Sequence, residues 1–508
     1  QTTSSDTVFS SSFIIDTKIP EFIPISDENS FYPNGSEIFE DYTNVEIQFS
    51  ATDDSDENGT VDVYLAYILG GWYLPIAENI PLSSSSTSAD FSIGGIVEES
   101  IWARLIFKAT DDYGNTLEQY NNDYFVLGSS EGDYGFIFES IKNSLRQGPD
   151  ENGYYGEFGS RYAPEILMSN LIELEKAFND AINDKHFISE FEYYLQEWVG
   201  RPNPLYFAER LTKKIGGSKI YLKSDHLNHL GAHKINNALF QVLLARRMGK
   251  TKILCETGAG AHLIAVAACC AKFNIPCVGY MGIEDVRKQS TNVLKAKLFN
   301  SKVIECVDGT GKKGVLKDAC TAALKAWSND PDAYYCCGST IASHPFPRIV
   351  QYAQSVIGKE IKKQILEKEN KLPDAIIACI GGGSNLMGAI HEFLDDKEVA
   401  LYGVEAEHSA ALTNGSVGIM QGFKSFMLQS EDGSETLPTS SLASGINFYS
   451  AGPEHAYLKS IGRVNYTYAT DEKAFEAFQL LCKTEGILPA FEPSFALAKT
   501  IELAKKMP

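Results

Sequence analysis

The spacing of hydrophobic residues divides the chain into two regions of different kinds. Between residues 44 and 127, apolar and polar residues alternate in short runs that Asp, Gly and Ser residues separate. A period of two predicts half-buried strands, and short strands with regular turns are typical of a β-sandwich. We therefore expect an all-β sandwich domain at residues 31–128, preceded by a Ser/Thr-rich segment at residues 1–30. The runs at residues 45–49, 61–65 and 102–107 show the pattern most plainly.

The tetrapeptide Ala-Thr-Asp-Asp occurs at residues 51–54 and again at residues 109–112, each time just after an alternating run. In this repetition of turns at strand ends, the region resembles immunoglobulin-like modules. The acidic residues at 53–57 could supply oxygen ligands to a calcium ion. A solvated acidic turn explains them more simply, so we expect no metal site.

From residue 136 to the end of the chain, helical and strand patterns alternate, after a Gly/Ser/Glu-rich linker at residues 129–135. Strands that alternate with helices form parallel sheets with helices on both faces and ligands at the carboxyl ends of the strands. We therefore expect an α/β domain here. The patterns predict helices at residues 178–198 and 234–248, and buried strands at residues 253–255, 277–281, 302–306, 375–380 and 401–404.

The charge and the cysteines limit the partners and the compartment. The formal net charge is −22, and only Lys18, Arg104 and Lys108 are basic before residue 129, so the acidity belongs mostly to the N-terminal region. Nucleic acids and anionic membranes recruit Lys and Arg, and no apolar stretch reaches the roughly 18 to 20 residues of a membrane helix, so we expect neither partner. All ten cysteines lie between residues 255 and 482, many in apolar runs and without zinc-ligand spacing, which predicts a reducing, cytoplasmic setting.

A glycine-rich segment separates the apolar run at residues 374–380 from a stretch with helical spacing. Glycines at a strand-to-helix junction let backbone N–H groups surround an anion, and no bulky side chain interrupts this segment. We therefore expect a phosphate site, with a tight connection between strand and helix as the alternative. The segment consists of Gly381, Gly382, Gly383, Ser384 and Asn385.

Lys234 is the candidate for covalent chemistry. It follows an expected strand at residues 219–223 and a polar loop, and it begins an amphipathic helix. A lysine at the mouth of a sheet can form a Schiff base with an aldehyde once burial lowers its pKa, although a lone lysine at a helix start is ordinarily solvated. The flanking His233 and Asn236, together with the expected phosphate site, favour the covalent role.

A second anion site is expected after the strand at residues 253–255. Glycines at the start of an apolar helix suit a substrate carboxylate. Glu256, at the end of the strand, would point into the cleft as an acid/base group, and a role in capping the turn is the alternative. The loop consists of Thr257, Gly258, Ala259, Gly260, Ala261 and His262.

In order and spacing, these segments resemble the β subunit of tryptophan synthase, a fold-type II enzyme that uses pyridoxal 5′-phosphate (PLP). The resemblance runs from residue 156 to the C-terminus. The motifs that carry it are Gly156-Glu157-Phe158-Gly159, Gly200-Arg201-Pro202, Gly231-Ala232-His233-Lys234, Glu256-Thr257-Gly258-Ala259-Gly260, Asp285, Gln289-Ser290, Asn292-Val293, His344-Pro345, Gly381 to Asn385, Gly452-Pro453-Glu454-His455-Ala456-Tyr457-Leu458 and Glu485-Gly486-Ile487.

The resemblance implies a PLP-dependent lyase that condenses L-serine with indole to give L-tryptophan, the last step of tryptophan biosynthesis. Lys234 would hold PLP as an aldimine, serine would lose its hydroxyl to give an aminoacrylate, and indole would attack that intermediate. Glu256 would assist departure of the hydroxide and deprotonate the indole-derived intermediate, and Ser494 would face the pyridine nitrogen. The implied cofactor-binding residues are His233, Lys234, Asn236, Ser339, Gly381, Gly382, Gly383, Ser384, Asn385, Glu485 and Ser494. The implied substrate-binding residues are Thr257, Gly258, Ala259, Gly260, Ala261, His262 and Asn447.

The resemblance also implies an architecture and partners. Residues 136–508 would form two open parallel-sheet domains, with a mobile subdomain at about residues 250–340. We expect a homodimer, a tryptophan synthase α subunit as a further partner, and a monovalent cation held by backbone carbonyl groups.

The chain departs from the family's pattern around the substrate. Ala261 stands where the family has Gln, which removes one polar side chain near substrate and cofactor. Asn447 and Lys288 stand where the family closes its mobile domain with an Asp and an Arg. Losing the carboxylate removes a charge-assisted bond of roughly 1.5 to 3 kcal/mol, so we expect closure to be weaker or differently selective. Met420-Gln421 replaces the family's Tyr-Phe tunnel gate, which leaves indole channelling and the α-subunit partnership open.

Three functions are therefore compared. The first is tryptophan synthesis, and the second is a related fold-type II activity, such as serine deamination or β-replacement with another nucleophile. The third is a PLP-binding protein with little catalysis that acts through its N-terminal module. Lys234, Glu256 and the glycine-rich segment favour an enzyme over the third function. The departures at Ala261 and Asn447 leave the second function open as an alternative to the first.

Overall fold

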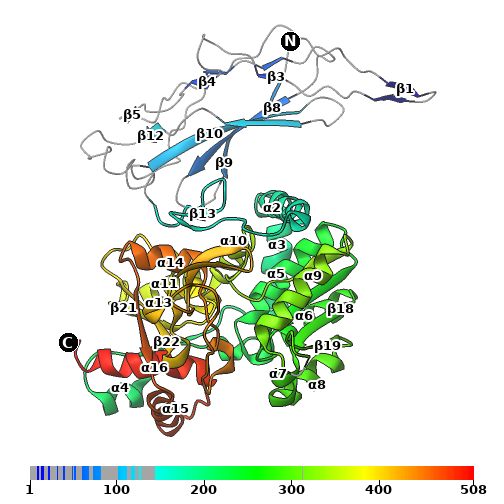
Figure 1. The fold of residues 1–508 in the computed structure, drawn as a ribbon. Helices are drawn as coiled ribbons and strands as arrows, with labels where there is room; N and C mark the ends of the chain where they lie inside the picture. Colours follow the sequence, from blue (N-terminus) through cyan, green and yellow to red (C-terminus); the bar gives the residue numbers. More distant parts are fainter. Residues whose placement is uncertain are drawn as a thin grey trace. The chain divides into compact units, whose positions relative to one another are not determined.

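The computed structural model divides the chain into two compact units, Gln1–Lys142 and Asn143–Pro508 (Figure 1). It describes residues 144–311 and 313–507 with their side chains, and within residues 1–143 it describes the strands only. No helix in the described part of the chain is both long and apolar enough to cross a membrane.

The described strands of the first unit are mainly antiparallel. The expected strands at residues 61–65 and 102–107 lie within β8 (Thr60–Tyr67) and β10 (Ile101–Thr110), which are neighbours in one sheet. The side chains that would join two sheets into a sandwich, and the acidic turn at residues 53–57, lie outside the described residues. The sheet has the order β5 (Ile38–Phe39), β12 (Phe125–Leu127), β10, β8, β9 (Tyr73–Pro81), with β11 (Thr116–Tyr120) paired to β10. Separate pairs are β1 (Val8–Ser10) with β2 (Phe13–Ile15), β3 (Glu21–Phe22) with β7 (Ala51–Thr52), and β4 (Phe31–Tyr32) with β6 (Gln48–Phe49).

The second unit is built on two parallel sheets, as the alternation of strands and helices predicts. All five expected strands are present, with bounds that differ by a few residues at most. The first sheet has the order β19 (Lys302–Cys306), β18 (Cys277–Gly282), β17 (Lys252–Thr257), β20 (Ala333–Tyr335). The second has the order β21 (Ala375–Cys379), β22 (Ala400–Ala406), β25 (Asn465–Ala469).

Helix α5 (Lys234–Arg247) is buried in the part of the second unit that contains the first sheet. All its residues from Ile235 to Ala245 are buried, and the ring of Phe240 packs edge-on against the rings of Phe178, Phe187 and Phe191. A helix packed on all sides cannot slide or rotate without opening cavities in the core. Lys234, at the first position of this helix, therefore has a fixed place.

The prediction of one helix at residues 178–198 is wrong. The chain forms α2 (Met168–Ile182) and α3 (Lys185–Tyr194), followed by a π-helical turn, Leu195–Val199. Asp184 separates them, because its carboxylate accepts hydrogen bonds from the N–H groups of His186 and Phe187 and so begins a new helix. The apolar spacing continues across the break, which is why it suggests a single helix.

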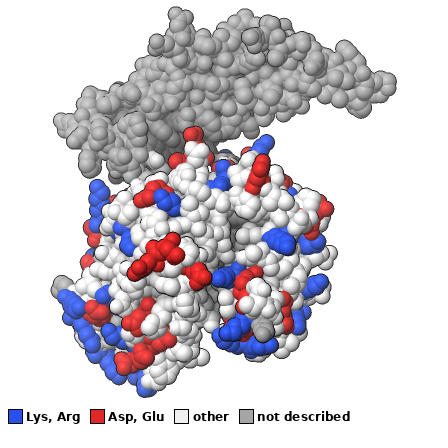
Figure 2. Space-filling view, in the orientation of Figure 1, with Lys and Arg blue, Asp and Glu red and all other residues white. Residues whose placement is uncertain are grey.

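Acidic and basic side chains are mixed over the visible surface of the second unit (Figure 2). Its remaining strands and helices are as follows. A small antiparallel sheet has the order β13 (Tyr154–Tyr155), β14 (Phe158–Gly159), β24 (Phe423–Met427), β23 (Ser416–Met420), and β15 (Leu205–Phe207) pairs with β16 (Tyr221–Lys223). The other helices are α4 (Glu209–Ile215), α6 (Ala261–Phe273), α7 (Ile283–Lys288), α8 (Ser290–Leu298), α9 (Leu316–Ser328), α10 (Phe346–Gln354), α11 (Val356–Glu369), α12 (Ser384–Ile390), α13 (Ala411–Asn414), α14 (Pro453–Ser460), α15 (Asp471–Glu485) and α16 (Phe491–Ala504).

Candidate active site

The fold brings the lysine segment and the glycine-rich segment into contact, although they lie 150 residues apart in the sequence. The amine of Lys234 donates a hydrogen bond to Ser384 Oγ over 3.2 Å and another to the carbonyl oxygen of Gly338. The ring of His233 also contacts Ser384, with 3.2 Å between Nε2 and Oγ. Ser384, in the glycine-rich segment, thus contacts both His233 and Lys234.

Burial changes the protonation of both residues at the start of α5. It lowers the pKa of Lys234 to about 8, although the carboxylate of Glu256 acts in the opposite direction. It also lowers the pKa of His233 well below its ordinary value, and the ammonium of Lys234 adds to that shift. At neutral pH, His233 is therefore a neutral imidazole, and a fraction of Lys234 is a neutral amine that can act as a nucleophile.

The glycine-rich segment presents N–H groups that are unpaired within the described part of the chain. Ser384 N–H donates to Ser339 Oγ over 3.3 Å, whereas the N–H groups of Gly382, Gly383 and Asn385 make no hydrogen bond to the described residues. Several unpaired donors at the start of a helix suit a phosphate.

The carbonyl groups of the same segment accept hydrogen bonds from other parts of the protein. Gly382 O accepts from Thr340 Oγ1 at 2.8 Å and from Gly452 N–H at 3.0 Å. Gly383 O accepts from His455 Nε2 at 2.9 Å. Gly383 also has a φ of +111°, and a Cβ on it would lie 2.3 Å from the His455 ring, so this position requires glycine.

Glu256 lies at the end of β17, next to Lys234. Gly338 joins the two residues, because its carbonyl accepts a hydrogen bond from Lys234 and its N–H donates to Glu256 Oε1 over 3.4 Å. Glu256 is only 7% exposed, and its Oε2 has no hydrogen-bond partner among the described residues. Burial raises the pKa of this carboxyl group to about 7, so protonated and ionised forms coexist at neutral pH.

The loop after Glu256, predicted as a second anion site, forms a turn at the start of α6. Gly260 N–H donates to Thr257 Oγ1 at 3.0 Å, and the chain then enters α6 at Ala261. His262 donates from Nε2 to Cys336 O at 2.9 Å, while its buried Nδ1 has no partner within the described part of the chain. Burial lowers the pKa of His262 to about 3, so it is neutral and offers a hydrogen-bond acceptor.

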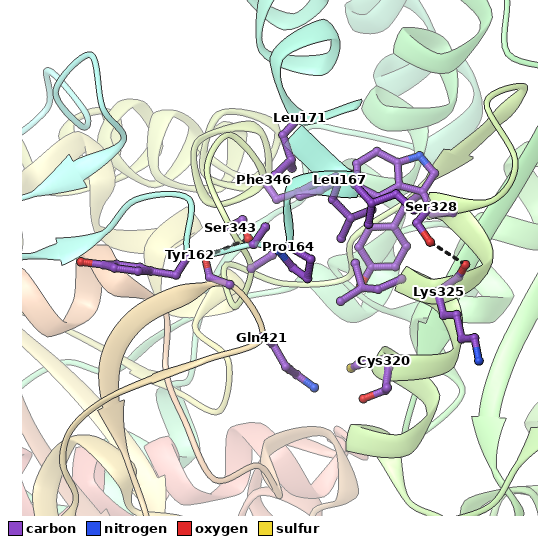
Figure 3. A pocket seen from close by; sticks show the side chains of 18 of the residues that line it. Tyr162, Pro164, Leu167, Leu171, Cys320, Lys325, Ser328, Ser343, Phe346 and Gln421 are labelled. Carbon is purple, nitrogen blue, oxygen red and sulfur yellow. Dashed lines mark hydrogen bonds between the residues drawn. The ribbon is translucent and has the colours of Figure 1, made fainter. Parts of the chain in front are cut away.

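Glu256 lines a cavity of about 480 Å³. Figure 3 shows its apolar wall, where Pro164, Leu167 and Phe346 lie together, and its opposite side, where Gln421 and Cys320 face each other. A volume of this size accommodates a small aromatic molecule. The other residues that line the cavity are Tyr162, Ala163, Ile166, Leu171, Thr321, Leu324, Lys325, Trp327, Ser328, Tyr335, Ile341, Ala342, Ser343 and Gly422.

Several sequence-predicted site residues are engaged in contacts within the protein. Asn236 accepts from Arg201 and donates to Gln354, behind the lysine. The carboxylate of Glu485 accepts from Tyr206 Oη and from Leu211 N–H at the start of α4.

The hydroxyl groups and amides of three others are likewise paired. Ser494 Oγ donates to Ala490 O at 3.0 Å, and the side-chain amide of Asn385 donates to Cys379 O at 3.4 Å. Asn447 Oδ1 accepts from Ser409 Oγ at 2.8 Å. The ligand-binding roles of these five residues stay predictions.

Two residues that orient the glycine-rich segment were not singled out by sequence reasoning. Thr340 lies in an irregular loop and has no local pattern that marks it. His455 lies in the motif Gly452 to Leu458, so the motif points to its position but not to the hydrogen bond that it makes.

Comparisons with known proteins identify the family of the chain. The family model described as pyridoxal-phosphate dependent enzyme matches residues 199–507. The tryptophan synthase beta chain of Dinoroseobacter shibae is 48% identical over 380 residues, which cover 73% of this chain and 92% of the relative. That of Rhodopseudomonas palustris strain BisA53 is 48% identical over 376 residues, or 72% and 92%. A solved threonine deaminase from T.th. aligns with a TM-score of 0.49 and 20% identity, over 66% of this chain and 94% of that structure. The chain belongs to the tryptophan synthase beta chain family of pyridoxal-phosphate dependent enzymes.

Proposed function

We propose that the protein condenses L-serine with indole to form L-tryptophan and water. The observation that carries the proposal is the position of Glu256, whose carboxylate lines an apolar cavity and is joined through Gly338 to a reactive lysine. An acid/base group next to both the cofactor lysine and a pocket for an aromatic molecule is what a replacement reaction at Cβ of serine requires.

PLP is the cofactor of this family, and the residues around Lys234 fit it. The free N–H groups of Gly382, Gly383 and Asn385, with Ser384 and His233 beside them, would hold its phosphate. Lys234 would hold its aldehyde carbon. When bound, PLP supplies an electron sink for negative charge at Cα of the amino acid.

Lys234 and the loop after Glu256 would position and deprotonate serine. With a pKa of about 8, the Lys234 amine can accept the proton on Cα near neutral pH and return it later. The N–H groups around Gly260, at the start of α6, would bind the carboxylate of serine. The buried Nδ1 of His262 offers an acceptor for the amino acid's hydrogen-bond donors.

Glu256 would act twice on the leaving and entering groups. In its protonated form it gives a proton to the departing hydroxyl, and in its ionised form it accepts the proton that indole loses. A pKa of about 7 makes both forms available at the same pH. The apolar wall of the cavity excludes water, which would otherwise compete with indole.

The remaining features of the proposal concern assembly and location. We propose a cytoplasmic homodimer that holds a monovalent cation, with a mobile subdomain at residues 250–340. A tryptophan synthase α subunit would bind near the outer end of the cavity, where Tyr162 and Ile166 are 41% and 61% exposed. The strands of the first unit would form the immunoglobulin-like module.

The test is to incubate the purified, PLP-loaded protein with serine, with and without indole, and to measure tryptophan and pyruvate. Tryptophan that appears only when indole is present supports the proposal. Pyruvate formed equally with and without indole, and no tryptophan, would instead establish serine deamination. Lys234→Ala is the control: it should remove both products and the visible absorption of the lysine-bound cofactor.

A further inference from the structure

Two polar side chains face each other on one side of the cavity that Glu256 lines. Gln421 and Cys320 line it, from the turn of the β23–β24 hairpin and from α9 respectively, and their side chains face each other (Figure 3). Gln421 and Cys320 therefore form one side of the cavity, opposite the wall formed by Leu167 and Phe346.

Gln421 is held in this place by its backbone. Its φ is +48°, which is uncommon for a residue other than glycine. The carbonyl of the next residue, Gly422, accepts hydrogen bonds from Ser343 Oγ at 2.8 Å and from Tyr162 N–H at 2.9 Å, so the turn is fixed to the cavity wall. The side chain lines the cavity, and the chain next to it is anchored at Gly422.

Hydrogen-bonding capacity inside the cavity is confined to a few groups. The hydroxyl groups of Ser343, Thr321 and Ser328 all donate to backbone carbonyls. The amide of Gln421, by contrast, interacts with the Cys320 thiol, which is a weak hydrogen-bond partner. An amide covered by an apolar ligand without a hydrogen bond is costly, so a ligand that supplies the missing bond is favoured.

We propose that Gln421, supported by Cys320, makes the enzyme select indoles that carry a hydroxyl or amino group on the six-membered ring. This inference rests on the proposed function and names the class of its second substrate. Glu256 takes the proton of the nucleophile, and the amide of Gln421 bonds to the ring substituent. Plain indole would fill the same space but leave the amide unpaired.

The experiment measures kcat/KM for indole and for the set of hydroxyindoles substituted on the six-membered ring, at saturating serine. We expect at least one hydroxyindole to be preferred over indole, and Gln421→Met, which keeps the length of the side chain, to lower that preference by about three- to tenfold, the value of one neutral hydrogen bond. Gln421→Asn keeps an amide and should retain part of the preference. Gln429→Met is the matched control, since Gln429 bonds to Ser416 and Val417 on the same hairpin and does not line the cavity.

Binding of the same compounds to the PLP-loaded protein, measured by calorimetry, separates this inference from the proposed function. If no compound is converted but hydroxyindole binds more tightly than indole and Gln421→Met removes the difference, the proposed reaction fails and the selectivity stands. If tryptophan forms and Gln421→Met changes indole and hydroxyindole equally, the reaction stands and the selectivity is overturned. Equal effects of Gln421→Met and Gln429→Met would also overturn it.

Discussion

At the scale of single residues, the site depends on two ionisable side chains whose charged forms are destabilised by burial. Lys234 and Glu256 are both buried, and burial moves the pKa of each toward neutrality, to about 8 and about 7. The same burial that costs stability supplies groups that exchange protons near neutral pH. The unpartnered Oε2 of Glu256 belongs to the same arrangement, because an oxygen that already accepted a hydrogen bond would be a weaker base.

Replacing Glu256 by Gln tests this at two levels. We expect kcat to fall at least about 100-fold, since Gln cannot exchange a proton, while the visible absorption of the lysine-bound cofactor is retained. Because folding raises the pKa of Glu256 from 4.5 to about 7, its neutral form is favoured in the folded state, and the stability associated with it is present below pH 4.5 and is lost as the pH rises through 7. Glu256→Gln should therefore have a higher Tm than the wild type at pH 8, and the difference should shrink toward pH 5.

Thermal unfolding at both pH values and a pH profile of kcat measure these effects, with Glu435→Gln, a change at an exposed position, as the control. A difference in Tm that is the same at pH 5 and pH 8 would show that Glu256 does not titrate between them.

At the scale of elements, the conformation of the glycine-rich segment depends on hydrogen bonds that other elements donate to its carbonyl groups. Helix α14 and the residue that precedes it supply two of the bonds, from His455 Nε2 to Gly383 O and from Gly452 N–H to Gly382 O. His455 is completely buried, and burial lowers its pKa to about 4, so it is neutral; with Nε2–H donating to Gly383, its Nδ1 accepts from Tyr466 Oη at 2.9 Å. A carbonyl fixed on one side of a peptide directs the N–H group of that peptide to the other side.

His455→Ala should therefore weaken cofactor binding. We expect the dissociation constant for PLP to rise about tenfold, because a freed Gly383 carbonyl lets the Gly383–Ser384 peptide rotate, which moves Ser384 away from Ser339 and His233 and disturbs the adjoining N–H groups that would bind the phosphate. Titration of the apo-protein with PLP, followed by visible absorption, measures the change. His455→Gln can donate from its amide and should recover part of the affinity, whereas His408→Ala, at an exposed histidine, should leave it unchanged. An unaltered affinity in His455→Ala would mean that the segment keeps its form without α14.

The elements of this half of the molecule could largely be predicted from the sequence, because local patterns specify them. The strand at residues 302–306 matches β19, and the predicted helix 234–248 differs from α5 by one residue. The break at Asp184 was missed because a helix cap is a single residue within a continuing apolar pattern. Contacts between distant segments could not be predicted, because local patterns carry no information about them. Nothing near His455 in the sequence indicates that its ring contacts Gly383.

At the scale of the whole molecule, the two units differ in charge as well as in fold. Of the 66 acidic and 44 basic residues, 25 and 4 lie in residues 1–142, which leaves 41 and 40 in the rest of the chain. The second unit is therefore almost neutral, in keeping with the mixed charges on its surface (Figure 2). Nearly all of the net charge of −22 is therefore carried by residues 1–142, whereas the described residues around Lys234 all belong to the second unit.

A chain that begins at Asn143 should keep the activity of the full protein. The site residues and the described hydrophobic clusters all lie in the second unit, so we expect kcat/KM for the serine and indole reaction to stay within about twofold and the Tm of the catalytic unit to be unchanged. Because a net charge near zero promotes association, the shortened chain should be less soluble near neutral pH than the full protein. Turnover, thermal unfolding and the soluble concentration between pH 6 and 8 are measured on both chains, with Lys234→Ala in each as the inactive control. A loss of turnover in a shortened chain that still binds PLP would show that the acidic unit acts on catalysis, and equal solubility of the two chains would show that its charge does not serve to keep the enzyme dispersed.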